Sequence, residues 1–175
     1  MKKLIFSIIA CFALVSSTFA QDAFNKGDMI VNFGIGFGNT INTGNNWKMN
    51  IPPITGSFEY ALIDNLFNDK SGIGIGGVLG FASQKYETSG VSVKYSDVIV
   101  AARGLFHYQF VRNLDTYAGL MLGYDIASGD GDLTSSGVAF GYYIGARYYF
   151  TNNFAVMAEL GDNVALFTIG VAFKF

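Results

Sequence analysis

Few residues in this sequence have the type and spacing that catalysis or metal binding needs. His107 is the single histidine, and a histidine that acts as a base needs a nucleophile within reach and access to substrate. No partner of that kind is evident, so we expect His107 to make a structural hydrogen bond. One histidine also excludes an all-histidine zinc site. The sequence therefore predicts no enzyme, no cofactor and no metal centre.

Two short motifs have some likeness to ligand-binding loops. Gly74-Ile75-Gly76-Gly77 has the glycines of a phosphate loop, but no helical pattern follows it, so a dinucleotide site is not expected. Small residues that let strands of a narrow sheet approach each other explain these glycines better. Asp130-Gly131-Asp132 has two calcium-type ligands but lacks the rest of a calcium loop, and we interpret it as a solvated turn.

Six charged residues share one property that points to their environment. Each lies within an alternating segment, on the face opposite the large apolar side chains. Period-two alternation would place six independent charges on that face by chance about one time in 64. The six are Glu59, Arg103, Asp125, Arg147, Glu159 and Lys174. A charged group that faces lipid costs about 2–4 kcal/mol at the midplane, so a membrane around the apolar face explains the pattern.

The elements that must position these charges are eight strands. Each segment places its apolar residues on one face and has the length of about 9–13 residues that a tilted membrane strand needs. The segments are 29–38, 54–62, 72–83, 98–110, 117–126, 138–150, 154–161 and 168–175. Together they predict an all-β fold, an eight-stranded antiparallel up-and-down transmembrane β-barrel that is closed by its first and last strands.

The links between these strands alternate in length. Long polar links are expected at 39–53, 84–97 and 128–137, whereas 63–71, 111–116 and 151–153 are shorter, as is the last link at 162–164. Outer-membrane barrels have short periplasmic turns and longer external loops, so the long links should be external and both termini periplasmic. Trp47, in the first long link, is either a contact residue or an interfacial anchor.

The interior of such a narrow barrel should be filled by its charged side chains. An eight-stranded barrel is just wide enough for side chains to fill it. Aligning neighbouring strands across their turns pairs Arg103 with Asp125, and Arg147 with Glu159. We expect these ion pairs to tie the barrel together across its interior and to block a pore.

The N-terminal 20 residues are typical of a secretory signal. Lys2 and Lys3 precede an apolar stretch, and a small-residue cleavage site ends at Ala20, so residues 21–175 form the predicted barrel domain. Cleavage as a lipoprotein at Cys11 is the less favoured alternative. Removal of the signal leaves nine basic residues against 13 acidic ones, a net charge of about −4, and no basic patch for nucleic acid.

The sequence also resembles a known family. Thr168, Gly170, Phe173 and Phe175 match the C-terminal signal that the β-barrel assembly machinery reads in bacterial outer-membrane barrels. Residues 145–154, followed by Glu159-Leu160-Gly161, resemble a closing hairpin of these barrels. The mature chain is similar to the small eight-stranded outer-membrane barrels typified by OmpX and the N-terminal domain of OmpA. The resemblance implies a monomeric barrel in the bacterial outer membrane, surrounded by lipid and lipopolysaccharide.

Architecture does not determine activity in this family. We expect an integral outer-membrane protein with a structural, envelope-integrity role or an adhesive role, in which external loops contact a protein or host ligand. The alternatives are a lipopolysaccharide-modifying enzyme, which needs an external Ser–His pair that this sequence lacks, and a narrow channel for small or hydrophobic solutes, which the interior charges oppose. A soluble lipocalin-like barrel would place its apolar face inward and its charges outside.

Overall fold

Eight strands follow one another along the chain. A computed structural model of the protein describes residues 23–38, 40, 46–88, 91–129 and 135–175. The predicted signal segment 1–20 and the Asp130-Gly131-Asp132 motif lie outside the described residues. The strands are β1 (Met29–Phe37), β2 (Trp47–Ile63), β3 (Ser71–Thr88), β4 (Val91–Val111), β5 (Leu114–Gly129), β6 (Gly137–Tyr149), β7 (Phe154–Asp162) and β8 (Phe167–Lys174).

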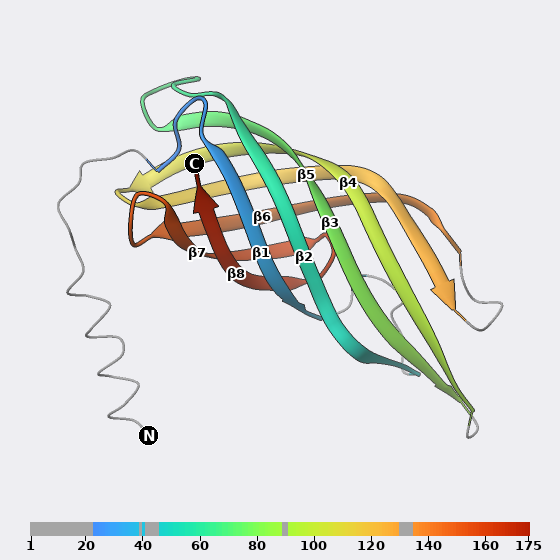
Figure 1. Ribbon diagram of the computed structural model, residues 1–175. Helices are drawn as coiled ribbons and strands as arrows, with labels where there is room; N and C mark the ends of the chain where they lie inside the picture. Colours follow the sequence, from blue (N-terminus) through green and yellow to red (C-terminus); the bar gives the residue numbers. More distant parts are fainter. Residues whose placement is uncertain (1–22, 39, 41–45, 89–90, 130–134) are drawn as a thin grey trace, which may run out of the picture.

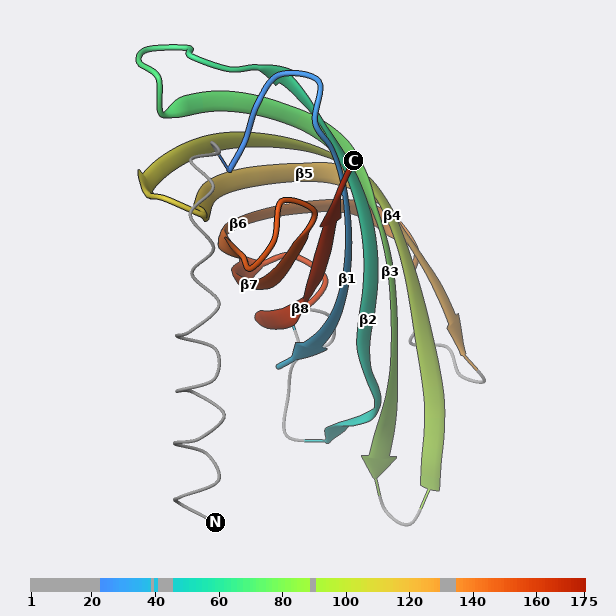
Figure 2. The ribbon, with the colours of Figure 1, turned by 60° about the vertical axis from the view of Figure 1, so that its left-hand side comes forward.

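The strands close into one antiparallel barrel. Each strand pairs with the next, and β1 pairs with β8, with Gly34 opposite Gly170 at that seam (Figures 1 and 2). Closure leaves no free sheet edge around the barrel itself, because every strand has two hydrogen-bonded neighbours there. In the described part of the chain, no helix has both the length and the apolar character to cross a membrane. The predicted eight-stranded, up-and-down barrel closed by its first and last strands is confirmed.

The two ends of the barrel differ. We call the end with the links β2–β3, β4–β5 and β6–β7 the turn end; it also carries the last residue, Phe175. The opposite end, with the links β1–β2, β3–β4, β5–β6 and β7–β8, is the loop end. Strands β3 and β4 have 18 and 21 residues, against nine and eight in β7 and β8. The sheet of β2 to β5 therefore extends beyond the rest of the barrel at the loop end (Figure 1).

Longer strands correct three of the predicted links, two at the loop end and one at the turn end. Strand β3 runs to Thr88 and β4 begins at Val91, so most of the predicted loop 84–97 is strand. Strand β2 begins at Trp47, inside the predicted loop 39–53. The predicted turn 111–116 shortens to Arg112 and Asn113, where Asn113 has a φ of 61°. Backbone pairing continues past the point where the side chains stop being apolar, because the ladder hydrogen bonds do not depend on side-chain type.

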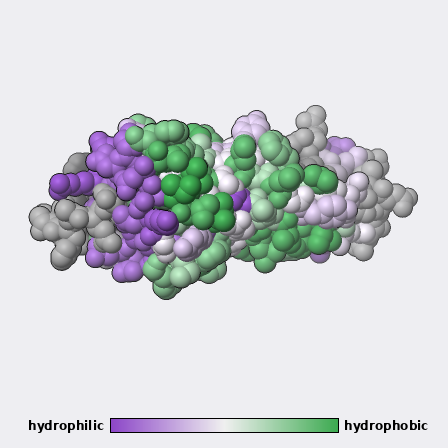
Figure 3. Space-filling view, turned by 90° about the horizontal axis from the view of Figure 1, so that it is seen from above, coloured by the Kyte–Doolittle hydropathy of each residue, from purple (hydrophilic) through white to green (hydrophobic). Residues whose placement is uncertain are grey.

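An apolar belt covers the outside of the barrel. Many of its outward side chains are at least 45% exposed, among them Phe33, Ile75, Leu120, Leu122, Phe140, Ile144, Leu160 and Ile169. Figure 3 shows apolar surface over the middle of the molecule, with hydrophilic surface gathered at the turn end. Exposed apolar patches of this extent are rare on soluble monomers, whereas lipid-facing barrels require them. The belt excludes a soluble, lipocalin-like arrangement.

Aromatic rings border this belt at the turn end. Tyr108 and Phe110 lie with ring centroids 4.8 Å apart, and Tyr148 and Phe150 lie 5.1 Å apart. Aromatic side chains suit the boundary between hydrocarbon and head groups, because one end of the ring system is apolar and the other is wet.

The belt predicts a position-dependent cost for a new charge on the outer face. Replacing Ile144, which is 61% exposed on the belt, by Arg should destabilise the barrel by about 2–4 kcal/mol. Ser128→Arg, two residues beyond the belt residue Ile126 on β5, is the matched control and should cost less than about 1 kcal/mol. Reversible urea unfolding in lipid vesicles measures both values, and equal costs would contradict a lipid-facing belt.

Candidate functional site: the charged lumen

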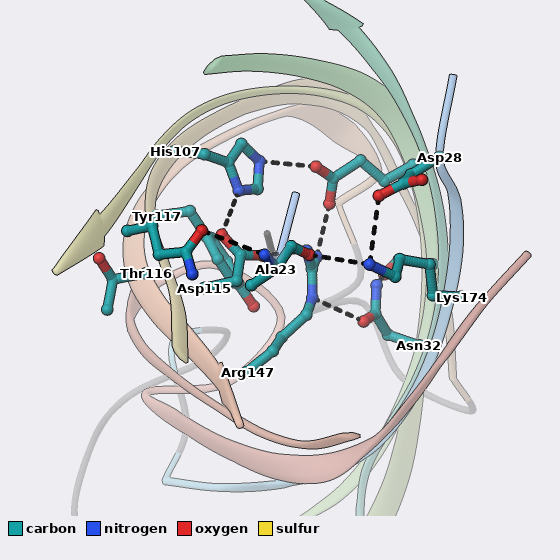
Figure 4. Close-up of polar contacts among 12 residues, drawn as sticks. Ala23, Asp28, Asn32, His107, Asp115, Thr116, Tyr117, Arg147 and Lys174 are labelled. Atoms are coloured by element: carbon teal, nitrogen blue, oxygen red, sulfur yellow. Dashed lines mark hydrogen bonds and ion pairs between the residues drawn. The ribbon is translucent and has the colours of Figure 1, made fainter. Parts of the chain in front are cut away.

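Arg147 lies at the centre of the lumen and binds three other strands. Its side chain, from β6, is 0% exposed. Nη2 lies 2.5 Å from Glu59 Oε2 of β2, and Nη1 lies 2.9 Å from Asp115 Oδ2 of β5. Nε donates to Asn32 Oδ1 of β1 at 3.0 Å (Figure 4). The planar guanidinium thus uses all three of its nitrogens and ties together strands from all round the barrel.

His107 completes a ring around the same two carboxylates. Its Nε2 lies 2.6 Å from Glu59 Oε1, and its Nδ1 lies 2.7 Å from Asp115 Oδ1 (Figure 4). Each carboxylate therefore contacts Arg147 with one oxygen and His107 with the other. A buried carboxylate is costly unless both oxygens have partners, and this ring of four side chains provides them. We call these four residues the lumen ring.

A second ion pair lies next to the lumen ring. Arg103 Nη2 of β4 lies 2.6 Å from Glu159 Oε1 of β7, and Arg103 Nε donates to the Tyr143 hydroxyl. The Tyr117 hydroxyl donates to the same Glu159 oxygen at 2.9 Å, and Asn163 Nδ2 donates to Glu159 Oε2 at 3.1 Å. The Arg103 guanidinium also lies over the Tyr143 ring, 4.2 Å from its centroid.

Two glycines make room for these tyrosines. A Cβ at Gly119 would collide with the ring of Tyr143, and a Cβ at Gly145 would collide with the ring of Tyr117. The tyrosines therefore lie flat across the glycines of neighbouring strands, and this brings their hydroxyls to the ion pair. Glycine is required at both positions by close approach.

The segment 23–28 closes the turn end of the lumen. The Phe24 ring stacks on His107 with centroids 3.8 Å apart, and Ala23 accepts a hydrogen bond from Lys174 through its carbonyl oxygen at 3.3 Å. Lys174 Nζ also lies 3.3 Å from Asp28 Oδ2 (Figure 4). The chain just before β1 therefore shields the lumen ring from solvent at this end.

An apolar layer fills the lumen on the loop-end side of the ion pairs. Val164, in the β7–β8 link, is 1% exposed and packs with residues of β3 to β6. We call this layer the loop-end plug; it consists of Val78, Ile99, Met121, Tyr143 and Val164. The observed link is 163–166, whereas the sequence predicted 162–164, and it is folded into the mouth of the barrel.

The structure places five of the six predicted charges in this interior network, but with partners other than those expected. Asp125 lies opposite Ile99, and Arg103 lies opposite Met121, so the predicted pair Arg103–Asp125 is wrong. Arg147 binds Glu59 and Asp115, so the predicted pair Arg147–Glu159 is also wrong. Long side chains reach across a narrow lumen more easily than along its wall. The alignment of neighbouring strands does not reveal which strands face each other across the lumen.

Sequence reasoning missed several members of the network. Asp115 was assigned to a turn, although it shares its parity with the inward residues Tyr117 and Gly119, and this signal could have identified it. Asn32 and Asp28 were also missed, the first because it is uncharged and the second because it precedes its strand.

Three residues of the predicted assembly signal, Thr168, Gly170 and Phe173, lie in β8, and Phe175 directly follows it. Thr168 is 1% exposed and faces the lumen, as does Gly170, while Phe173 and Phe175 face outward. Their role as an assembly signal stays a prediction.

The lumen offers little to a substrate. His107 is 1% exposed, and both ring nitrogens lie against carboxylates, so neither is available as a base to an outside group. Within the described ranges, no group of three or more His, Cys, Asp or Glu side chains is placed to hold a metal ion. The arrangement is suited to holding strands together.

No protein-family model matches the chain, and no curated protein matches it by sequence. Among solved structures, a de novo designed transmembrane β-barrel is 19% identical with a TM-score of 0.52; the match covers 86% of this chain and 98% of that one. Ail, the attachment invasion locus protein of Yersinia pestis in complex with the heparin analogue sucrose octasulfate, is 12% identical with a TM-score of 0.50, over 86% of this chain and 100% of that one.

The N-terminal β-barrel domain of Pseudomonas aeruginosa OprF is 18% identical with a TM-score of 0.48, over 86% of this chain and 98% of that one. At these identities the likeness concerns the fold. Together with the closed topology and the apolar belt, the first two matches establish that the chain has the fold of the small eight-stranded transmembrane β-barrels.

Proposed function

We propose that this protein is an integral outer-membrane barrel, with its turn end in the periplasm and its loop end outside the cell. Its role is structural or adhesive, and the lumen is solid. The observation that carries the proposal is the division of the molecule into an apolar belt, a sealed interior and a long sheet beyond the belt. Short turns on the periplasmic side and longer external elements are usual in such barrels.

The external sheet carries a row of like charges. Lys48, Lys85 and Lys94 lie directly opposite one another on β2, β3 and β4. Like charges that lie opposite one another destabilise a sheet. Within the described residues the row has one ion pair, between Lys48 and Glu87. A row of this kind is stabilised when an anion binds to it, so the chemistry favours a phosphate- or sulfate-bearing partner.

The distance of the lysine row from the apolar belt favours the lipid head groups of the outer leaflet as its binding partner. On β4 the last large apolar residue on the outer face is Val98, and Lys94 lies four residues beyond it, about 13 Å along the strand. Basic residues at that distance from hydrocarbon meet the charged groups of anionic lipid. We therefore propose lipopolysaccharide phosphates as the ligands of the row. Ail was solved with a sulfated sugar, which makes sucrose octasulfate a suitable soluble probe.

The remaining alternatives have weaker support. The loop-end plug and the two ion pairs lie across the path that a solute would take, which opposes a channel. The buried position of His107 opposes an enzyme that acts on lipid. Contact with an external protein or host ligand would use the same extended sheet, and it stays part of the adhesive role that we propose.

The solid lumen predicts a large effect of removing Arg147. Arg147→Ala leaves Glu59 and Asp115 buried with one partner fewer each, and it should cost about 3–5 kcal/mol in urea unfolding from lipid vesicles. Arg112→Ala, in the exposed β4–β5 turn, is the control and should stay within about 0.5 kcal/mol of the wild type. Equal stability of the two variants would refute a central role for Arg147.

The filled lumen also predicts that the barrel conducts no ions. The wild-type barrel in a planar bilayer should show no steady single-channel conductance, while a general porin added to the same bilayer serves as the positive control. Stable, reproducible openings of the wild-type protein would contradict the solid lumen and favour the channel.

The lysine row predicts weaker binding of anionic ligands when it is neutralised. The triple variant Lys48→Gln, Lys85→Gln, Lys94→Gln should lose on the order of 100-fold in affinity for labelled lipopolysaccharide or sucrose octasulfate in neutral detergent, at about 1 kcal/mol per lysine. Neutralising Lys26, Lys70 and Arg112 at the turn end changes the net charge equally and should leave the affinity almost unchanged. Equal losses in both variants would show that net charge alone matters.

A further inference from the structure

Two carboxylates lie together on the inner face of the sheet at the loop end. Asp97 of β4 lies opposite Ala127 of β5, and Asp125 of β5 lies opposite Ile99, so the two aspartates are diagonal neighbours. Both belong to the inward positions of their strands, and diagonal neighbours in a sheet are about 7–8 Å apart or closer. Their carboxylates can therefore approach a common point.

These carboxylates have oxygens without a donor. Asp97 is 2% exposed. Its Oδ2 and the Oδ1 of Asp125 are shielded from solvent and have no hydrogen-bond partner within the described part of the chain. A buried carboxylate without a partner is costly, and a second one beside it raises the cost through like-charge repulsion. The pair therefore needs a positive charge.

Among the basic residues after residue 20, no side chain is placed to supply that charge. The nine lysines and arginines after residue 20 all lie within the described ranges. Arg103, Arg147 and Lys174 bind other acids, as does His107. The others lie at the turn end (Lys26, Lys70 and Arg112) or in the outward lysine row (Lys48, Lys85 and Lys94).

The surroundings separate the two aspartates from the ion pairs deeper in the lumen and leave room beside them. Ile99 and Val164 of the loop-end plug lie between Asp97 and Arg103 along the lumen. Opposite Asp125 on β6 is Gly137, where an added Cβ would meet no atom within 4 Å. Gln84 of β3, which is 2% exposed, adds an amide to the same inner face, diagonal to Asp97.

We propose that Asp97 and Asp125 bind a divalent cation with a preference for oxygen ligands, represented by Ca²⁺, at the external mouth of the barrel. Calcium takes six to eight oxygens at about 2.3–2.6 Å, and two carboxylates with water in the open space beside Gly137 satisfy it. The ion neutralises both aspartates and ties β4 to β5 beyond the loop-end plug. The site is separate from the lysine row, which lies on the opposite face of the sheet, so it stands or falls independently of the proposed function.

The single tryptophan of the chain makes this site measurable. Trp47 lies on the inner face, with its ring centroid 5.1 Å from that of Tyr95, and Tyr95 is two residues from Asp97 on the same face. Tb³⁺ occupies calcium sites and luminesces when a nearby tryptophan is excited. Titration of the refolded wild-type barrel in neutral detergent should give a saturable Tb³⁺ signal that Ca²⁺ displaces.

Asparagine variants provide the decisive comparison. Asp97→Asn and Asp125→Asn should each weaken Tb³⁺ binding at least tenfold, and the double variant should abolish the signal. Asp69→Asn, in the exposed β2–β3 link, is the charge-matched control and should bind as the wild type does. Heat-modifiable gel migration establishes that each variant forms a closed barrel.

A second measurement does not depend on the tryptophan. Millimolar Ca²⁺ should raise the thermal unfolding midpoint of the wild type and of Asp69→Asn, but not that of the double variant. The proposal is overturned if the wild type gives no saturable signal at millimolar Tb³⁺, or if the double variant responds as the wild type does. Infrared spectroscopy gives a third test. The proposal is overturned if the carboxyl band of a proton shared by the two aspartates is present and does not change when Ca²⁺ is added.

Discussion

The burial of Arg147 is the constraint on which the rest of the barrel depends. A guanidinium with no exposed surface is costly unless it is paired, and here each of its three nitrogens has an acceptor, from β1, β2 and β5. Those acceptors must be at fixed heights on their strands, so the ring specifies the register of strands that are not neighbours. Because His107 contacts the same two carboxylates, the register of β4 is specified as well. A shift of any of these strands by one residue would turn its partner in this network toward lipid.

The interior and exterior of this protein exchange the roles that they have in a soluble domain. Apolar side chains on the outside leave water when the barrel inserts, but they face hydrocarbon whether or not the strands are paired in the correct register, so their transfer does not select that register. Specificity must then come from the lumen, where a misplaced charge has no water to compensate it. This explains why ion pairs, which contribute little on a protein surface, are concentrated in the lumen of this barrel.

The alternation of side chains predicts what a strand residue faces, but not what it touches. Parity alone placed Glu59, Arg103, Arg147, Glu159 and Lys174 in the interior, because a barrel wall has only two faces. The partners depended on the curvature of the closed wall, which brings β6 within reach of β2 and β4 within reach of β7. Nothing in one sequence encodes that reach in a readable form, so both predicted pairs were wrong.

Strand ends were misjudged for a related reason. The apolar alternation marks the thickness of the hydrocarbon, and it stops near Phe81 and Val98, whereas backbone pairing continues to Thr88 and Val91. The predicted segments therefore correspond to the membrane-spanning part of each strand and not to its full length. Trp47 was misplaced by the same step: it lies in β2 and packs against Tyr86 and Tyr95 on the inner face.

The distribution of charge along the axis divides the barrel into levels with different tasks. At the turn end, the lumen ring and Phe24 hold the strands together and exclude water. Above them, the loop-end plug separates this ring from Asp97 and Asp125. Since charges in the interior are shielded from those at the mouth, substitutions in the extended sheet can change its ligands without disturbing the register below. For the same reason, both binding sites that we propose lie in the extended sheet of β2 to β5.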